Sequence, residues 1–100
     1  MIFLYTTHKN KEEAEKITSL LLEKRLIACV NYFPIEACLI WQGQKTSENE
    51  VVALYKTSTT KAVTAEQVIL EHHPYEVPCI IHIEAKANAS YEDWVKETTS

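Results

Sequence analysis

A long extended segment at residues 28–41 (ACVNYFPIEACLIW) restricts the fold of this 100-residue chain more than any other feature. Its β-branched, aromatic and other apolar residues are typical of a strand. The polar region 42–49 (QGQKTSEN), which holds the only glycine, predicts a turn into a second strand at 50–57 (EVVALYKT). A strand as long as the first extends roughly 46 Å at about 3.3 Å per residue, whereas a compact domain of this size measures roughly 30–35 Å across. The hairpin is therefore expected to bend or to project.

The middle of this hairpin carries Pro34, which cannot donate a hydrogen bond to a sheet ladder, so we expect a bulge or a bend there. Apolar side chains on a projecting ribbon would promote aggregation unless another subunit covered them. We therefore expect an obligate oligomer.

The segments on either side of the hairpin alternate between strand and helix patterns. A short buried strand is predicted at residues 2–6 and a helix at 11–26, where Asn10 is followed three residues later by glutamate in the spacing of a capping box. A second helix is predicted at 60–72, and Pro74 limits it because proline disfavours helical geometry in the residue before it.

A last strand is predicted at 77–85, with Cys79, Ile81 and Ile83 on one face, which would place Cys79 in the core. The histidine and glutamate between and after them would lie on the opposite face. A short C-terminal helix is predicted from Ser90, because an aspartate follows three residues later and an apolar stripe continues beyond it.

The predicted order is β-α-β-β-α-β followed by a short helix, which is the ferredoxin-like arrangement of the α+β class: an antiparallel sheet with helices on one face. One such domain accounts for residues 1–100. The second face of the sheet is left bare, and its apolar residues are a further reason to expect a partner subunit.

Composition and charge argue against several classes of protein. Acidic residues outnumber basic ones 14 to 10 without a basic run, which argues against nucleic-acid binding. No apolar run approaches the roughly 20 residues needed to cross a bilayer, and the apolar start MIFLY is too short for an export signal. Cys29, Cys38 and Cys79 are odd in number and lack C-x-x-C spacing, as expected of reduced thiols. A cytoplasmic protein without a membrane segment is predicted.

His72 and His73 are adjacent at the predicted end of the second helix, and two interpretations of them stay open. Imidazoles bind copper, zinc and nickel, and at a helix end that unwinds the two rings can converge on one ion. Alternatively, histidines near a helix C-terminus simply interact favourably with the helix dipole and its last carbonyl groups.

Catalysis is not expected, because the chain has no G-x-S-x-G, no H-E-x-x-H and no glycine-rich phosphate loop. Cys38 and Cys79 are interpreted as small apolar residues. Cys29 shares a strand face with polar Asn31, so that edge of the sheet is a candidate for a cleft.

Three segments in this order, EKRLIACVN (23–31), WQGQ (41–44) and HHPYEVPCII (72–81), resemble the CutA family of divalent-cation tolerance proteins. YKTS (55–58) and YEDWV (91–95) also match, so the resemblance extends over essentially the whole chain. It implies a ferredoxin-like fold, a homotrimer joined edge to edge through the long hairpins, and a cytoplasmic protein linked to copper and other divalent metals.

In that family, copper ligation is attributed to the two histidines before Pro-Tyr, which are His72 and His73 here, and to a cysteine of the first strand. Tyr5 stands at the position of that cysteine, so the third ligand is either missing or supplied by another residue, for which neighbouring His8 is a candidate. The resemblance therefore implies an imidazole site for Cu(II) rather than a thiolate site for Cu(I).

Two main hypotheses for function follow. The first is a non-enzymatic homotrimer that binds divalent metal, copper foremost, at the adjacent histidines and takes part in metal tolerance or the response to metal. The alternative is a module similar to the trimeric PII-like signalling proteins, in which a cleft between subunits takes a small anionic ligand. The candidate residues for that cleft are Cys29, Trp41, Lys56, His73, Tyr75 and Glu76. A scaffold for another protein is a third interpretation, because a fold alone never fixes function.

Overall fold

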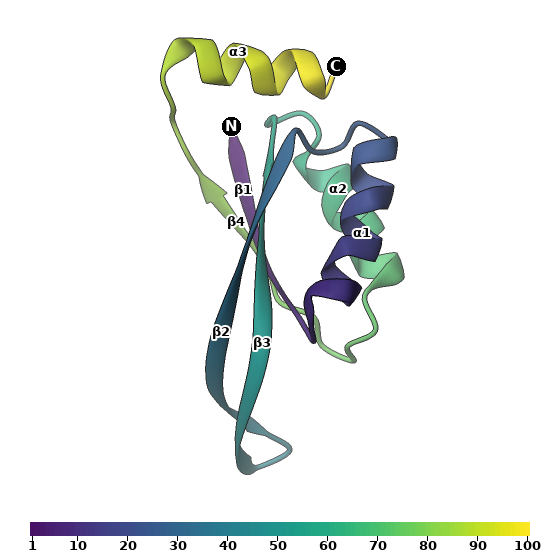
Figure 1. Ribbon diagram of the computed structural model, residues 1–100, viewed down its shortest axis with the longest axis vertical. Coiled ribbons are helices and arrows are strands. Elements are labelled where there is room, and N and C mark those ends of the chain that lie inside the picture. The colour runs from purple at the N-terminus through teal and green to yellow at the C-terminus, as the bar shows by residue number, and fades with distance from the viewer.

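The computed structural model describes residues 1–100 and has the predicted order of elements. Along the chain these are β1 (Ile2–His8), α1 (Lys11–Glu23), β2 (Cys29–Trp41), β3 (Gln44–Thr57), α2 (Ala62–His72), β4 (Ile80–Glu84) and α3 (Ala89–Thr98). The strands form one antiparallel sheet in the order β2-β3-β1-β4. Figure 1 shows α1 and α2 against one face of this sheet and α3 across the end at which the N-terminus lies. The predicted α+β ferredoxin-like fold is confirmed.

The core lies between the sheet and the two helices α1 and α2. Buried and half-buried residues alternate along the whole of β1, so every second side chain, including Leu4, faces the helices. Tyr55 is the residue opposite Leu4 on β3, and it is fully buried together with Leu21 of α1 and Ile69 of α2. Burying each of these large side chains stabilises the fold by about 1.5–3 kcal/mol.

Helix α1 begins as predicted but ends earlier. Asn10 Oδ1 accepts a hydrogen bond from the backbone N–H of Glu13 at 2.9 Å and so caps the helix. The predicted C-terminal end is too late, because the helix stops at Glu23 and Arg25 adopts a φ of 55°. This left-handed residue turns the chain back, and Ile27 enters the core with 1% exposure.

The β2-β3 hairpin projects from the rest of the molecule, as its length predicts (Figure 1). The longest dimension of the molecule is 45 Å, against 24 and 20 Å for the others. The prediction that the turn covers residues 42–49 is wrong. Trp41 pairs with Gln44, so the turn consists of Gln42 and Gly43 alone. These two residues have φ values of 50° and 78°, and positive φ at both positions gives a two-residue turn that fits the twist of the strands.

Of the two alternatives predicted at Pro34, a bulge or a bend, the bulge is absent. Pro34 pairs with Val51 in a register that runs unbroken from Cys29 to Trp41. Strand β2 lies at the edge of the sheet, so one of its sides has no partner strand and a missing N–H group is tolerated there.

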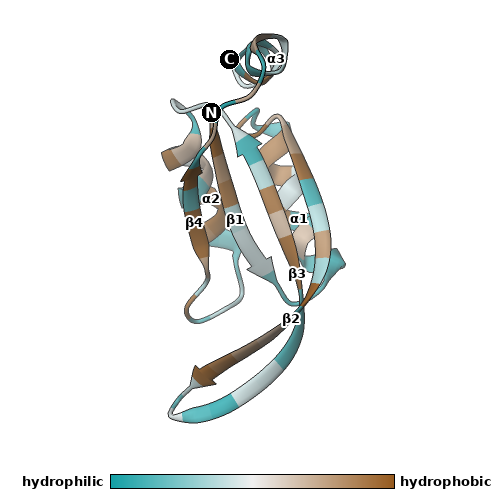
Figure 2. Cartoon of the chain, turned by 90° about the vertical axis from the view of Figure 1, so that its left-hand side faces the viewer, coloured by the Kyte–Doolittle hydropathy of each residue, from teal (hydrophilic) through white to brown (hydrophobic).

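Strand β4 is shorter than predicted, and its two faces are the reverse of the prediction. Ile81 and Ile83 are 49% and 42% exposed on the side away from the helices, and Cys79 precedes the strand and is half-buried. His82 lies instead on the helix side, where its Nε2 is 2.5 Å from Glu66 Oε1 of α2. Figure 2 looks onto the uncovered side, where β4 is largely hydrophobic. Alternation alone does not indicate which face packs on helices when both faces carry apolar residues.

Helix α3 starts after Asn88 rather than at Ser90, and it makes no side-chain capping bond. Val95 is the one buried residue of this helix. The rings of Tyr91 and Trp94 contact each other, with centroids 5.6 Å apart. None of the helices combines the length and the apolar composition needed to cross a membrane.

Candidate functional site

The first candidate site lies where α2 ends and the chain turns toward β4. His72 is the last residue of α2 and is exposed, whereas His73 caps the helix and is only 8% exposed. Pro74 follows directly and is the reason that the helix stops. The two adjacent histidines therefore face different surroundings.

Both ring nitrogens of His73 are hydrogen-bonded within the chain. Its Nδ1 accepts from the backbone N–H of Tyr75 at 3.2 Å. Nε2 consequently carries the proton and donates to the carbonyl oxygen of Thr7 at 2.8 Å. A metal needs a nitrogen lone pair, so it would have to displace one of these two bonds. Metal ligation by His73 stays a prediction, and it requires the loop to rearrange.

His8, the candidate third ligand, is buried against His73. The two rings stack with centroids 4.9 Å apart, and His8 Nε2 lies 3.0 Å from the hydroxyl oxygen of Tyr55. His8 Nδ1 is buried without a hydrogen-bond partner. Burial, and to a smaller extent the neighbouring His73, lowers the pKa of His8 to about 4. Tyr5 lies on the opposite face of the sheet from His8, because side chains alternate along a strand.

A second group of predicted residues lines a cavity of about 310 Å³. The ribbon of β2 and β3 curves so that its tip approaches the segment between α2 and β4 (Figure 2). The lining residues are Thr7, Leu39, Trp41, Glu48, Glu50, Tyr75, Glu76, Val77 and Cys79. The structure thus brings together three of the predicted cleft residues, namely Trp41, Tyr75 and Glu76. We call this space the acidic cavity.

Carboxylates dominate the electrostatics of the acidic cavity, through Glu48, Glu50 and Glu76. The Tyr75 hydroxyl donates to Glu50 Oε2 at 2.7 Å. Burial, this hydrogen bond and the negative charge of Glu50 and Glu48 raise the pKa of Tyr75. Burial and Glu50 also raise the pKa of the Cys79 thiol, so both groups are neutral at physiological pH. Such a lining attracts cations and repels anions.

Cys29 of β2 and Lys56 of β3 lie at the end of the hairpin that is opposite to Trp41. They pair directly across strands, and Cys29 Sγ is 3.6 Å from the hydroxyl oxygen of Tyr91 in α3. Lys56 Nζ lies 5.6 Å from the centroid of the Tyr91 ring. The predicted cleft residues therefore form two separate groups within one chain. An inter-subunit cleft that joins them stays a prediction.

Within one chain, no group of three or more histidine, cysteine, aspartate or glutamate side chains converges as metal ligands would. The accessible donors are the exposed imidazole of His72 and the carboxylates of the acidic cavity. Both donor types suit divalent ions. A complete set of ligands requires either a rearrangement or donors from another subunit.

Two features of these sites are absent from the prediction. His8 continues the alternation of buried residues that begins at Ile2, and this period-two signal would have placed it in the core. Glu48 lies in the predicted turn region, and nothing in the local sequence indicates that the ribbon curves to bring Glu48 and Glu50 beside Tyr75.

Comparison with known proteins gives matches over nearly the whole chain. The family model described as CutA1 divalent ion tolerance protein matches residues 2–98. The divalent-cation tolerance protein CutA of Thermococcus kodakarensis is 41% identical over 95 residues, which are 94% of this chain and 91% of that protein. The structure of the periplasmic divalent cation tolerance protein CutA from Archaeoglobus fulgidus covers 100% of both chains with a TM-score of 0.95 and 36% identity. The PII-like protein CutA from Nostoc sp. PCC 7120 in apo form has a TM-score of 0.90 and 38% identity over 100% of this chain and 98% of that one.

Proposed function

The chain belongs to the CutA1 divalent ion tolerance protein family, and from this premise we propose that it is a non-enzymatic protein that binds divalent metal ions, copper foremost, in metal tolerance. The observation that carries the proposal is the acidic cavity, where three glutamates gather beside the chain segment that directly follows His72. Carboxylates are common ligands of divalent cations, and imidazole is a donor that copper favours. Of the three glutamates, Glu76 lies four residues after His72, so donors of both kinds lie close together in that segment of the chain.

Titration of Cu(II) by calorimetry tests this proposal. Replacing His72 by alanine is expected to weaken binding by about tenfold or more, because it removes the one exposed imidazole at the site. His82→Ala is the matched control, since His82 pairs with Glu66 and does not line the acidic cavity. His73 is left unchanged, because its loss would leave the Thr7 carbonyl without its partner.

A second variant separates the carboxylates from the imidazole. Glu50→Gln with Glu76→Gln keeps the size of both side chains and removes two charges from the acidic cavity, so it is also expected to weaken Cu(II) binding. If wild type, His72→Ala and the double glutamine variant gave the same isotherm, the site would be wrong.

We further propose that the chain assembles as a homotrimer through its ribbon and its uncovered sheet face, as the family resemblance implies. Ile40 on the ribbon is 70% exposed, and Phe33 and Ile81 are 39% and 49% exposed. Exposed apolar groups of this kind mark an interaction surface. A neighbouring subunit could also complete the set of metal ligands that one chain lacks.

Sedimentation at micromolar and nanomolar concentration is expected to show a single species of three chains, each of 11.5 kDa. Replacing Ile40 by aspartate would place a charge on the surface that assembly covers and should shift the species toward monomer. A wild-type chain that sediments as a stable 11.5 kDa monomer would refute the trimer.

The second candidate function is a PII-like module that takes a small anionic ligand between subunits. Lys56 favours it, because no carboxylate of the chain forms a salt bridge with Lys56 and its ammonium group lies over the Tyr91 ring. A thermal-shift screen of nucleotides and metabolites discriminates the two functions, since a ligand that binds the native state raises its melting temperature. A screen in which only metals raise it would exclude the module.

We also propose a cytoplasmic location. All three cysteines are free, which suits a reducing compartment. The Archaeoglobus fulgidus relative is called periplasmic, so cell fractionation with a periplasmic marker is the direct test.

A further inference from the structure

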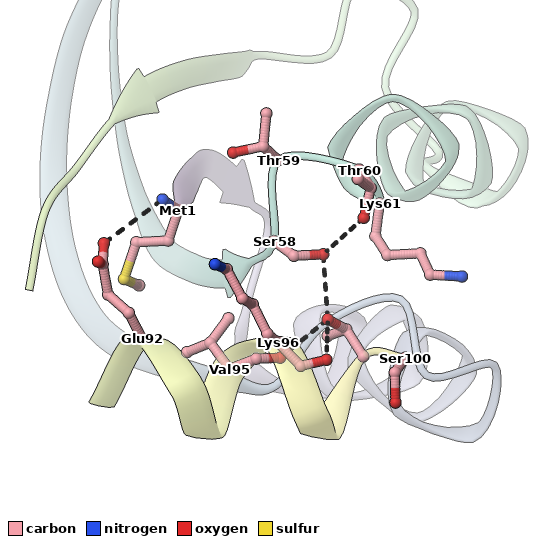
Figure 3. A pocket seen from close by; sticks show the side chains of 10 residues that line it. Met1, Ser58, Thr59, Thr60, Lys61, Glu92, Val95, Lys96 and Ser100 are labelled. Carbon is pink, nitrogen blue, oxygen red and sulfur yellow. Dashed lines mark hydrogen bonds and ion pairs between the residues drawn. The ribbon is translucent and has the colours of Figure 1, made fainter. Parts of the chain in front are cut away.

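A second cavity, of about 400 Å³, lies between α3 and the loop that joins β3 to α2 (Figure 3). Its volume is within the range of roughly 300–1,000 Å³ that is usual for small-molecule sites. Only two of its ten lining residues are hydrophobic, so its chemistry is polar. Three hydroxyl side chains come from the loop and two from the end of α3, and two lysines complete the polar set: Ser58, Thr59, Thr60, Thr99, Ser100, Lys61 and Lys96.

The two lysines leave positive charge at this cavity without a partner. Neither Lys61 nor Lys96 takes part in a salt bridge, although acidic residues outnumber basic ones in the chain. Glu92 is the one acidic side chain in the lining, and its Oε1 is already engaged. This oxygen accepts from the backbone N–H of Ala87 at 3.3 Å and lies 3.7 Å from the terminal amine of Met1. The charged side chains of the lining are therefore two lysines and one glutamate.

The hydroxyl groups of the cavity form an ordered row. Thr99 Oγ1 donates to the Val95 carbonyl oxygen at 2.8 Å and lies 3.0 Å from Ser58 Oγ, which in turn lies 3.3 Å from Thr60 Oγ1. A hydroxyl has one hydrogen, which Thr99 can donate either to the Val95 carbonyl oxygen or to Ser58 Oγ. Thr59 makes no side-chain hydrogen bond within the chain, so its hydroxyl hydrogen is available to a ligand.

The two lysines lie on opposite sides of the hydroxyl row (Figure 3). In Figure 3 the Lys96 side chain extends from α3 toward the region between Glu92 and Ser58. The Lys61 side chain extends away from Thr60 on the other side of Ser58. Both side chains are flexible and make no internal hydrogen bond, so they can turn toward a bound anion without breaking a contact.

We propose that this cavity, which we call the lysine cavity, binds a small oxyanion of the phosphate type. Phosphate oxygens accept hydrogen bonds from ammonium and hydroxyl groups. Charge-assisted hydrogen bonds of this kind are about twice as strong as hydrogen bonds between neutral groups. A phosphate group carries a charge of about −1.5 to −2 at neutral pH, which two lysines balance. The inference does not depend on metal binding, because the lysine cavity shares no residue with the acidic cavity.

Amide chemical shifts of the full chain test the lysine cavity directly. Inorganic phosphate and glycerol phosphate are each added at constant ionic strength, with chloride as the reference anion. Saturable shifts are expected at residues 59–61 and 96–100. Tighter binding of glycerol phosphate would identify a phosphorylated small molecule as the ligand class, and tighter binding of inorganic phosphate would identify the free anion.

Charge-matched variants decide whether the lysines are responsible. Lys61→Gln with Lys96→Gln is expected to raise the dissociation constant for phosphate by about tenfold or more, whereas Lys24→Gln with Lys45→Gln removes the same charge elsewhere and should change it little. Circular dichroism checks that each variant is folded, and Lys96→Gln alone serves if the double variant is not. The absence of saturable shifts, equal shifts with chloride, or equal losses in both double variants would each overturn the proposal.

Discussion

Replacing Leu21 by alanine is expected to lower the free energy of unfolding by about 2–5 kcal/mol. Leu21 is fully buried in the core cluster between α1 and the sheet, so the shortened side chain leaves a cavity there. The measurement is denaturant unfolding followed by circular dichroism. All samples need the same protein concentration, because assembly makes the apparent stability depend on it.

Leu22→Ala is the matched control for this effect. Leu22 is the next residue of the same helix and is 46% exposed, so both variants undergo the same chemical change and the same change in helix propensity. The control is expected to lose less than about 1 kcal/mol. Equal losses at the two positions would show that α1 does not pack on the sheet through the face that carries Leu21.

The parts of the fold that the sequence predicts correctly depend on local or purely geometric signals. Asn10 supplies a capping oxygen three residues before Glu13, and the bond forms without help from the rest of the chain. The projection of the hairpin follows from its length alone, and the 45 Å dimension of the molecule confirms it. Signals of this kind do not depend on which other elements pack nearby.

The parts that the sequence predicts wrongly depend on contacts between distant segments. Ile81 and His82 alternate as expected, but the choice of face is made by α2, where Glu66 pairs with His82. The polar residues after Gly43 have the composition of a turn, and their pairing with β2 makes them strand instead. Polar composition is typical of exposed residues, and residues 44–49 are mostly exposed. On a projecting ribbon, however, exposed residues can also form a strand.

The candidate sites show the same limit. The adjacent histidines can be found in the sequence, but their unequal roles cannot, because His73 obtains its hydrogen bonds from Thr7 and Tyr75. Thr7 is distant in the chain and offers only a backbone carbonyl, which no side-chain motif reveals. The separation of Trp41 from Cys29, by contrast, already follows from the strand predicted at 28–41, which places these two residues at its opposite ends.

Lowering the pH from 7 to 4 is expected to destabilise the protein by about 3 kcal/mol through His8 alone. Burial in the first place, and the nearby His73 in the second, lower the pKa of His8 from 6.5 to about 4 in the folded protein. Above pH 6.5 the ring is neutral in the folded and the unfolded states, so it contributes no pH dependence. Between pH 6.5 and 4 the unfolded chain binds a proton that the folded protein does not, and the stability associated with neutral His8 is lost. The loss from this group is nearly complete at pH 4 and levels off below it.

The contribution of His8 can be isolated by comparing the change in unfolding free energy between pH 7 and pH 4 in three proteins. His8→Asn removes the titrating ring, so its change is expected to be smaller than that of wild type by about 3 kcal/mol, whatever its stability at pH 7. His72→Asn removes an exposed histidine whose side chain makes no hydrogen bond or ion pair in the chain, so it should change as wild type does. Equal changes in wild type and His8→Asn would contradict the burial of a neutral ring. His8 stacks on His73, whose Nε2 donates to the carbonyl oxygen of Thr7, so the neutral ring of His8 packs directly against the residue that fixes Thr7.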